Sequence, residues 1–340
     1  MAINKARGNR ARKPERIASA PDDWADHRPA LSLWSGAAWR YFRRVSAANS
    51  ISEPTLAAWL ASGALCEADG GRLYHQVAGA GPWLVCFHGF PTSSWDWHRV
   101  LPALARHRRV LVFDFPGYGL SEKSADRDYS LLRQLDAATA LLRSLGVVEF
   151  DLVAHDMGNS VACELLHRLE TGATELRPRS LTLLNGGIYM DLHRPLLTQR
   201  LLRVPLLGEL TARLSSWRVF SHQFRQVYAR PEQFDEAHYR QHWELLRHND
   251  GRRTLAKIAG YMRERVRRGE RWLGPLHRTT LPLTLVWGRD DPVAVYAIAE
   301  RLCRRNPRAR LVTLAGVGHY PQLEAPAEVA AAILRAIGVE

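Results

Sequence analysis

The 340-residue chain has no long hydrophobic segment, because no run approaches the roughly 18 apolar residues of a membrane-spanning helix. It also has few cysteines, and Cys66, Cys86, Cys163 and Cys303 lie far apart without a CxxC spacing. We therefore expect free thiols in a reducing compartment, with no zinc site and no disulfide framework. Since the first residues lack the apolar core of a secretory signal, we expect a cytoplasmic protein.

Acidic residues are scarce relative to basic ones, with 34 Asp and Glu against 47 Lys and Arg and a formal net charge of +13. The basic excess is concentrated in residues 1–20 and 189–275. A domain that reads nucleic acid pairs its basic face with a recognition helix, an RNP-type aromatic motif or a zinc finger, and the sequence has none of them. We interpret the arginines as solvated surface and expect no nucleic-acid partner.

Residues 1–50 differ in composition from the rest of the chain. Their basic start, punctuated by Gly and Pro, is typical of disordered chain. Residues 31–45 (LSLWSGAAWRYFRRV) form an amphipathic pattern of aromatic and arginine side chains. This pattern suits either a helix that makes peripheral contact with a membrane or a short helix packed on the domain. Regular structure is expected to begin with Ser52 as the N-cap of a helix through Leu60.

From that helix onward, short apolar runs alternate with helical patterns such as 131–145 and 161–169. Nearly continuous hydrophobicity over about five residues is typical of central strands that are covered on both faces. Alternating strands and helices predict an α/β fold with a parallel sheet and right-handed crossovers. The predicted strands are 83–87, 110–113, 150–154, 181–184, 283–287 and 310–314.

Residues 189–275 interrupt this alternation, because they show helical periodicity without a strand-like run. We expect a helical cap (lid) inserted into an α/β core made of residues 56–188 and 276–340. A cap at this point of the chain would lie over the carboxyl ends of the strands, where open α/β sheets bind ligands. Its predicted helices are 195–206, 232–248 and 254–268.

The segment FDLVAHDMGN (150–159) carries the strongest chemical signal. A strand ends at Ala154, a helix begins near Asn159 or Ser160, and Asp156 lies between Ala154 and Gly158. This is the strand–turn–helix pattern of a nucleophile elbow, whose strained central residue leaves room only for small neighbours. A carboxylate is ionised at neutral pH, so Asp156 can attack an sp3 carbon without a base and form an ester with the enzyme.

Hydrolysis of such an ester creates an oxyanion that needs hydrogen-bond donors. The motif CFHGFP (86–91) follows a predicted strand, so the backbone N–H of Phe90 can supply one donor and the N–H of Met157 the other. Gly89 allows close approach of the backbone. We interpret His88 as a structural residue that hydrogen-bonds its own loop.

The base and its orienting acid are expected to follow the nucleophile in that order along the chain. LVWGRDDP (285–292) ends a strand with two aspartates, and VGHYPQ (317–322) follows the last strand. We assign His319 as the general base and Asp291 as the carboxylate that holds its imidazole. Asp290 is the alternative acid. No cofactor and no metal ion is needed for this chemistry.

The motifs HGFPTSSWDW, DFPGYGLSEK, HDMG, WGRDDPV and GHYPQLEAP together resemble the α/β-hydrolase fold, in its epoxide hydrolase and haloalkane dehalogenase branch. LNGGI (184–188), HRPLL (193–197) and HNDG (248–251) are similar to the mesoderm-specific transcript group within that branch. The likeness covers roughly residues 56–338. It implies a mostly parallel eight-stranded sheet with helices on both faces and a cap, and hydrolysis of a small hydrophobic molecule.

Differences between this sequence and its better-understood relatives narrow the choice among the reactions that the resemblance implies. Haloalkane dehalogenases hold the leaving halide with side-chain N–H donors, and fluoroacetate dehalogenases use an arginine after the nucleophile. This sequence has Met157 and Phe90 at the corresponding positions. An epoxide hydrolase is therefore favoured, with Tyr261 as its first candidate acid and Tyr189, Tyr228 and Tyr239 as further cap tyrosines. Trp95 and Trp97 are interpreted as pocket wall. A haloalkane dehalogenase and a non-catalytic, membrane-associated member remain alternatives.

Overall fold

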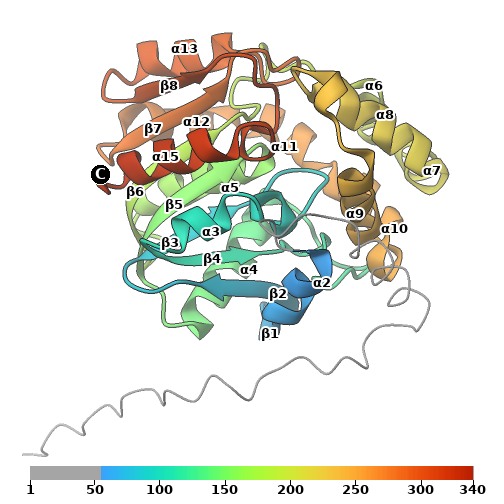
Figure 1. Ribbon diagram of the computed structural model, residues 1–340, viewed down its shortest axis with the longest axis horizontal. Coiled ribbons are helices and arrows are strands. Elements are labelled where there is room, and N and C mark those ends of the chain that lie inside the picture. The colour runs from blue at the N-terminus through green and yellow to red at the C-terminus, as the bar shows by residue number, and fades with distance from the viewer. Residues whose placement is uncertain (1–54, 340) are drawn as a thin grey trace, which may run out of the picture.

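An eight-stranded sheet forms the centre of the molecule (Figure 1). The structure is a computed structural model that describes residues 55–339. Along the sheet the strands follow the order β1-β2-β4-β3-β5-β6-β7-β8; β1 and β4 each pair antiparallel with β2, and every other pair is parallel. This confirms the predicted α/β fold with a mostly parallel eight-stranded sheet. The strands are Ala64–Ala68, Gly71–Ala78, Trp83–Phe87, Arg109–Phe113, Glu149–His155, Arg177–Leu184, Leu283–Gly288 and Arg310–Leu314.

The hairpin of β1 and β2 is not among the strands that apolar runs predict. β1 is mostly half-buried and β2 carries the polar residues Arg72, His75 and Gln76, so neither strand has the continuous hydrophobicity of a central strand. The turn between them places Asp69 and Gly70 at positive φ. Antiparallel edge strands need only one apolar face, and a run-based prediction does not detect them.

Side chains on the central strands alternate between two hydrophobic clusters, one on each face of the sheet. Val85 and Phe87 belong to the first cluster, while Leu84 and Cys86 belong to the second. Helices α4, α5, α12 and α13 contribute to the first cluster, and α2, α3 and α15 to the second. Their bounds are Leu131–Ser144, Met157–Glu170, Gly269–Arg278 and Ala297–Arg305 for the first, and Leu56–Ser62, Leu101–Leu104 and Pro326–Ala336 for the second.

The first described helix, α2, begins later than predicted. Its N-cap is Thr55, whose Oγ1 accepts a hydrogen bond from the N–H of Ala58 at 3.2 Å. Ser52, the predicted N-cap, lies outside the described residues, as do the predicted extension 1–50 and its amphipathic segment 31–45. Within residues 55–339, no helix combines the length and the apolar character that crossing a bilayer would require. All four cysteines are free thiols, as expected.

Seven α-helices, α6 to α12, lie between β6 and β7, where the cap 189–275 was predicted. We name the first six the cap, and α6 to α10 lie on the right of the sheet in Figure 1. Two predictions need correction. The first cap helix ends at Leu202 instead of continuing to Leu206, because Pro205 has no N–H to extend it. The predicted helix 254–268 is two helices, separated at Ala259 and Gly260. The helices α6 to α11 are Leu197–Leu202, Leu207–Leu214, Trp217–Val227, Glu236–Arg247, Arg252–Ile258 and Tyr261–Arg267.

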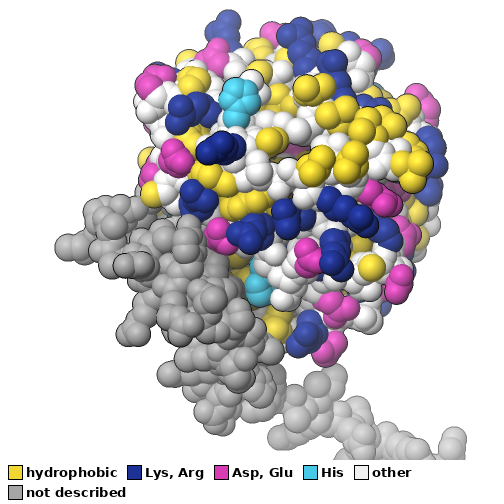
Figure 2. Space-filling view, turned by 90° about the vertical axis from the view of Figure 1, so that its right-hand side faces the viewer, with side chains coloured by type: hydrophobic (Ala, Val, Ile, Leu, Met, Phe, Trp, Pro, Cys, Tyr) yellow, Lys and Arg dark blue, Asp and Glu magenta, His cyan; other side chains and the backbone are white. Residues whose placement is uncertain are grey.

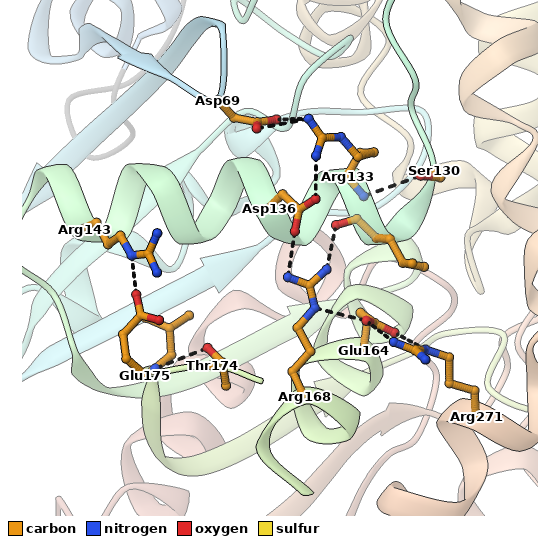
Figure 3. A network of polar contacts seen from close by, with 12 residues as sticks. Asp69, Ser130, Arg133, Asp136, Arg143, Glu164, Arg168, Thr174, Glu175 and Arg271 are labelled. Atoms are coloured by element: carbon orange, nitrogen blue, oxygen red, sulfur yellow. Dashed lines mark hydrogen bonds and ion pairs between the residues drawn. The ribbon is translucent and has the colours of Figure 1, made fainter. Parts of the chain in front are cut away.

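The helix that follows the cap, α12, returns to the core and packs on α5. Glu164 of α5 is fully buried and accepts hydrogen bonds from the Arg271 guanidinium at 2.8 Å and from the Trp272 indole N–H at 2.9 Å. Arg168 extends this network from Glu164 to Asp136 of α4 (Figure 3). Burial alone would raise the pKa of Glu164, but these donors lower it to about 2. The carboxylate thus stays ionised and joins three helices.

Candidate active site

The turn between β5 and α5 holds Asp156 in a strained conformation, with φ at +45° and ψ at −108°. A non-glycine residue rarely adopts a positive φ, and strain of this kind concentrates at functional sites. Two glycines make the turn sterically feasible. A Cβ at position 158 would lie 2.7 Å from the Phe87 carbonyl oxygen, and one at position 89 would lie 2.9 Å from the Asp156 Cβ. Gly158 is therefore required by close backbone packing against the loop after β3, and Gly89 by the close approach of that loop to Asp156.

The Asp156 carboxylate is buried and surrounded by groups that stabilise its charge. Its Oδ2 accepts a hydrogen bond from the backbone N–H of Phe90 at 3.0 Å, and its Oδ1 lies 3.7 Å from Nη2 of Arg265. Burial favours the protonated acid, but the charge of Arg265, together with His319 and the Phe90 N–H, lowers the pKa of Asp156 below its usual value. The ionised form that a nucleophile requires is thus favoured.

Of the two oxyanion donors predicted from the sequence, the structure shows a contact with this carboxylate for Phe90. Phe90 N–H already donates to Asp156 Oδ2. Helix α5 begins at Met157, so the N–H of Met157 has no acceptor within the helix and lies at the positive end of the helix dipole. An oxyanion that develops on the Asp156 side chain would meet both groups.

His319 and Asp291 form a buried pair, with Nδ1 of the imidazole 2.8 Å from Oδ2 of the carboxylate. Backbone N–H groups of Val293 and Ala294 donate to Asp291 Oδ1 at 2.7 and 2.9 Å, and the Asn185 side-chain amide donates to Oδ2 at 2.8 Å. Three donors thus fix the carboxylate that holds the imidazole. Its neighbour Asp290 is exposed and instead accepts from the N–H of Gly316.

His155, which precedes Asp156 in the chain, and His319 have opposite protonation preferences, although their ring centroids are 5.3 Å apart. Burial lowers the pKa of His319, but the charge and hydrogen bond of Asp291 and the charge of Asp156 raise it to about 9. Burial and the charge of His319 lower the pKa of His155 to about 4. Neutral His155 can donate its Nε2 proton to the His319 carbonyl oxygen, 2.8 Å away. His155 therefore positions the loop that carries the base.

The structure agrees with the prediction for His88 and disagrees with the prediction for Trp95 and Trp97. Neutral His88 bridges its own loop, because its Nδ1 lies 2.8 Å from the Gly89 carbonyl oxygen and its Nε2 accepts from the Phe115 N–H. Trp95 and Trp97 are fully buried in the second hydrophobic cluster and do not line the active-site cavity. The wall prediction for these two tryptophans is corrected: they form a short 3-10 helix whose apolar rings face the core.

Among the four cap tyrosines, only Tyr261 packs against the oxyanion loop, with its ring 5.5 Å from that of Phe90. Burial and the charge of Asp156 raise its pKa, so its hydroxyl stays protonated. That hydroxyl has no hydrogen-bond partner among the described residues. Tyr228 and Tyr239 belong to an aromatic cluster of the cap, and Tyr189 bonds His277 near the surface.

Three residues of the site were not anticipated from the sequence. Arg265 of α11 is buried and donates from Nη2 to the Asp156 carbonyl oxygen at 2.9 Å and from Nε to Ser160 Oγ at 2.6 Å. Tyr118, from the loop after β4, donates its hydroxyl to the Met157 sulfur at 2.9 Å. Asn185 follows β6 at its carboxyl end, and that position is the one signal that could have identified it.

An apolar cavity of about 300 Å³ lies between the cap and the carboxyl ends of the strands. Its wall includes Phe90, His319 and Tyr320 of the core, and the rest is contributed mainly by cap side chains such as Phe220, Phe224, Leu202, Leu246 and Leu255. The cavity thus reaches Phe90 and His319, although Asp156 itself is not part of its wall. Its size and lining suit a small hydrophobic ligand.

Comparisons with known proteins agree with this geometry. Residues 82–326 match the family model described as alpha/beta hydrolase fold. The human mesoderm-specific transcript homolog protein (Homo sapiens) is 36% identical over 284 residues, which cover 80% of this chain and 85% of that protein. Among solved structures, the epoxide hydrolase CorEH superimposes with a TM-score of 0.67 at 20% identity, covering 80% of this chain and 97% of that one.

A loop variant of the haloalkane dehalogenase DbeA from Bradyrhizobium elkanii gives the same TM-score of 0.67, at 22% identity and with 82% and 96% of the two chains covered. Likeness at this level of identity shows a shared fold, while the family match and the human relative extend over most of the chain. The chain belongs to the α/β-hydrolase fold family, and it is similar in sequence to the mesoderm-specific transcript proteins.

Proposed function

We propose that this protein is a hydrolase in which Asp156 forms a covalent alkyl ester with the substrate, and that its substrate is a small hydrophobic epoxide. One observation carries the proposal: a carboxylate occupies the strained elbow, 3.0 Å from an oxyanion-loop N–H. A serine or cysteine there would suit acyl transfer, whereas a carboxylate suits displacement at an sp3 carbon. The pair of His319 and Asp291 supplies the base that the second step needs.

In the first step, an oxygen of the Asp156 carboxylate attacks a ring carbon, a carbon–oxygen bond of the epoxide breaks, and the departing oxygen takes a proton. The Tyr261 hydroxyl is the proposed donor, because it is protonated, buried and without another partner. In the second step, neutral His319 removes a proton from water, and the hydroxide attacks the ester carbonyl of Asp156. Collapse of the oxyanion breaks the bond between the ester carbonyl carbon and the alkyl oxygen, which takes the proton from His319 and leaves as part of a diol. The carboxylic acid of Asp156 gives up its proton, which restores the Tyr261 hydroxyl, and the carboxylate is regenerated.

Support for an epoxide over a haloalkane comes from the side chains around Asp156. A departing halide is stabilised by N–H donors, whereas Met157 and Phe90 have none in their side chains. A departing alkoxide needs a proton donor; the Tyr261 ring packs on that of Phe90, and the Tyr118 hydroxyl contacts the Met157 sulfur. Tyr118 lies outside the cap, and it is the proposed second hydroxyl. Haloalkane hydrolysis and a non-catalytic role are the alternatives that the next experiment separates.

The isotope pattern of a single turnover tests the ester mechanism. With enzyme in excess over an epoxide in oxygen-18 water, the first diol should carry an unlabelled oxygen from Asp156, and Asp156 should gain the label. Mass spectrometry of the product and of the Asp156 peptide measures both. Solvent label in the first diol would exclude the ester, and turnover of haloalkanes but not epoxides would replace the proposed substrate. Inactivity toward both panels would favour the non-catalytic alternative.

The two chemical steps should respond differently to pH. Protonated His319 cannot accept a proton from water, so ester hydrolysis should accelerate as pH rises through the pKa of His319 and then level off. In the ester Asp156 is neutral, and its contribution to the raised pKa of about 9 is lost. The inflection for hydrolysis should therefore fall below pH 9. Rapid-quench measurement of each step tests this, and the same inflection in ester formation would contradict the assigned role of His319.

A further inference from the structure

Exposed hydrophobic side chains are concentrated on one face of the cap. Of ten large hydrophobic residues that are exposed among residues 55–339, seven lie within 197–219. Leu206 is 83% exposed, and Leu197 and Leu214 are each 70% exposed. Figure 2 shows hydrophobic side chains gathered on this side of the molecule. We name this set the α6–α7 face: Leu197, Val204, Leu206, Leu207, Leu210, Leu214 and Val219.

The most exposed member of the face is held in place by a strained turn. α6 ends before Pro205, and Leu206 then adopts φ of +62° as the residue preceding α7. A leucine has no local hydrogen bond to compensate for this conformation, unlike Asn or Asp. The turn directs an apolar side chain away from the core. Exposure of the Leu206 side chain to water is unfavourable, and its transfer into an apolar phase outside the protein would be favourable.

Arginines surround the α6–α7 face. Residues 192–230 contain seven arginines and only one acidic residue, Glu209. Arg200, Arg213 and Arg218 are exposed, and Figure 2 shows Lys and Arg side chains bordering the hydrophobic ones. Leucines bordered by arginines match the composition of helices that lie in the interface of an anionic bilayer. A second copy of this chain would set one basic segment against another, which like charges disfavour.

The same face adjoins the entrance of the active-site cavity. Leu214 and Val219 are exposed members of the face and also line the cavity, and Leu201, Thr211 and Ser215 beside them complete that part of the wall. We propose that the α6–α7 face docks on the surface of an anionic phospholipid bilayer. In this orientation of the protein, the entrance of the cavity would face the acyl chains of the bilayer. The docking itself does not depend on the proposed chemistry, whereas passage of an apolar substrate from the bilayer does.

Vesicle sedimentation of the full chain tests the docking. Wild type should bind vesicles of phosphatidylcholine with phosphatidylserine, bind pure phosphatidylcholine weakly, and lose binding as salt is raised. Leu206→Asp/Leu210→Asp should weaken partition by about tenfold or more, since both side chains would insert. Neither residue lines the cavity. The control is Val148→Asp, an exposed valine before β5, at the opposite end of the sheet from the cap.

Amide hydrogen exchange of the wild type provides a second measurement that needs no variant. Anionic vesicles should slow exchange in peptides spanning residues 197–219. Slowing confined to residues 1–54, unchanged binding of Leu206→Asp/Leu210→Asp, or equal loss in Val148→Asp would overturn the proposal. Concentration-dependent dimers that disappear in the double variant, with no vesicle binding by wild type, would instead assign the face to contact between copies. If docking holds while epoxides and haloalkanes are untouched, only the proposed chemistry fails.

Discussion

His319→Gln should block hydrolysis of the covalent ester while leaving formation of the ester intact. Glutamine cannot accept a proton from water, so the ester on Asp156 should form and then persist. Steady-state turnover should fall by roughly 10⁴-fold or more, as it does when a member of a catalytic triad is removed. Intact-protein mass spectrometry after incubation with an epoxide should show an increase equal to the whole substrate.

Variants of the neighbouring carboxylates provide the controls for this result. Asp156→Asn lacks the nucleophile and should give neither adduct nor product. Asp291→Asn should slow hydrolysis, because it removes the charge that holds His319 and stabilises its protonated form. Asp290→Asn is the matched control, since its side chain is exposed on the Gly316 turn. If His319→Gln gave no adduct while remaining folded, or if Asp290→Asn lost as much activity as Asp291→Asn, the assignment would be wrong.

Arg265→Leu should have the second largest effect, on stability and on activity together. The buried guanidinium holds the Asp156 carbonyl oxygen and Ser160, and it is the group that lowers the Asp156 pKa most. Its loss leaves a carboxylate buried without its charge partner, which costs on the order of 3 kcal/mol. The Asp156 pKa should rise, so the acidic limb of the rate profile for ester formation should move to higher pH.

Two substitutions separate the charge of Arg265 from its shape. Arg265→Lys retains the positive charge but cannot hold Asp156 and Ser160 with one planar fork, so it should restore the acidic limb more fully than the stability. Arg267→Leu, at an exposed position of the same helix, should change neither. Thermal unfolding and the pH profile of ester formation measure the two effects. An acidic limb that stays in place in Arg265→Leu would show that Arg265 acts only on packing.

The positions of Asp156, Asp291 and His319 could be predicted because each follows an apolar strand; their catalytic roles stay a proposal. Parallel strands bring their carboxyl ends to one edge, so Asp156, Asp291 and His319 converge although they are far apart in the sequence. No comparable signal marks Arg265. It lies on a helix rich in arginine, and only the break at Ala259 and Gly260, which helical periodicity does not reveal, separates α11 from α10.

For Trp95 and Trp97 the prediction from the sequence was wrong. Their position after the oxyanion loop suggested a role in the pocket, but the large aromatic rings of this short 3-10 helix are buried in the core. Trp95 meets Trp59 of α2 edge to face at 5.2 Å and stacks on His98. A position close in sequence to a functional loop does not indicate whether a side chain points into the pocket or into the core.

The attachment of α12 to α5 determines which part of the cap can move. Glu164 ties Arg271 and Trp272 to the helix that begins at the nucleophile, and α11, with Arg265, immediately precedes α12. The C-terminal half of the lid is thus anchored to the catalytic scaffold through buried charge. The end of α8 is attached to the core as well, because the N–H of His319 donates to the Val227 carbonyl oxygen at 2.9 Å. An opening of the cavity that keeps both attachments would have to come from α6 and α7, the helices that carry most of the exposed leucines.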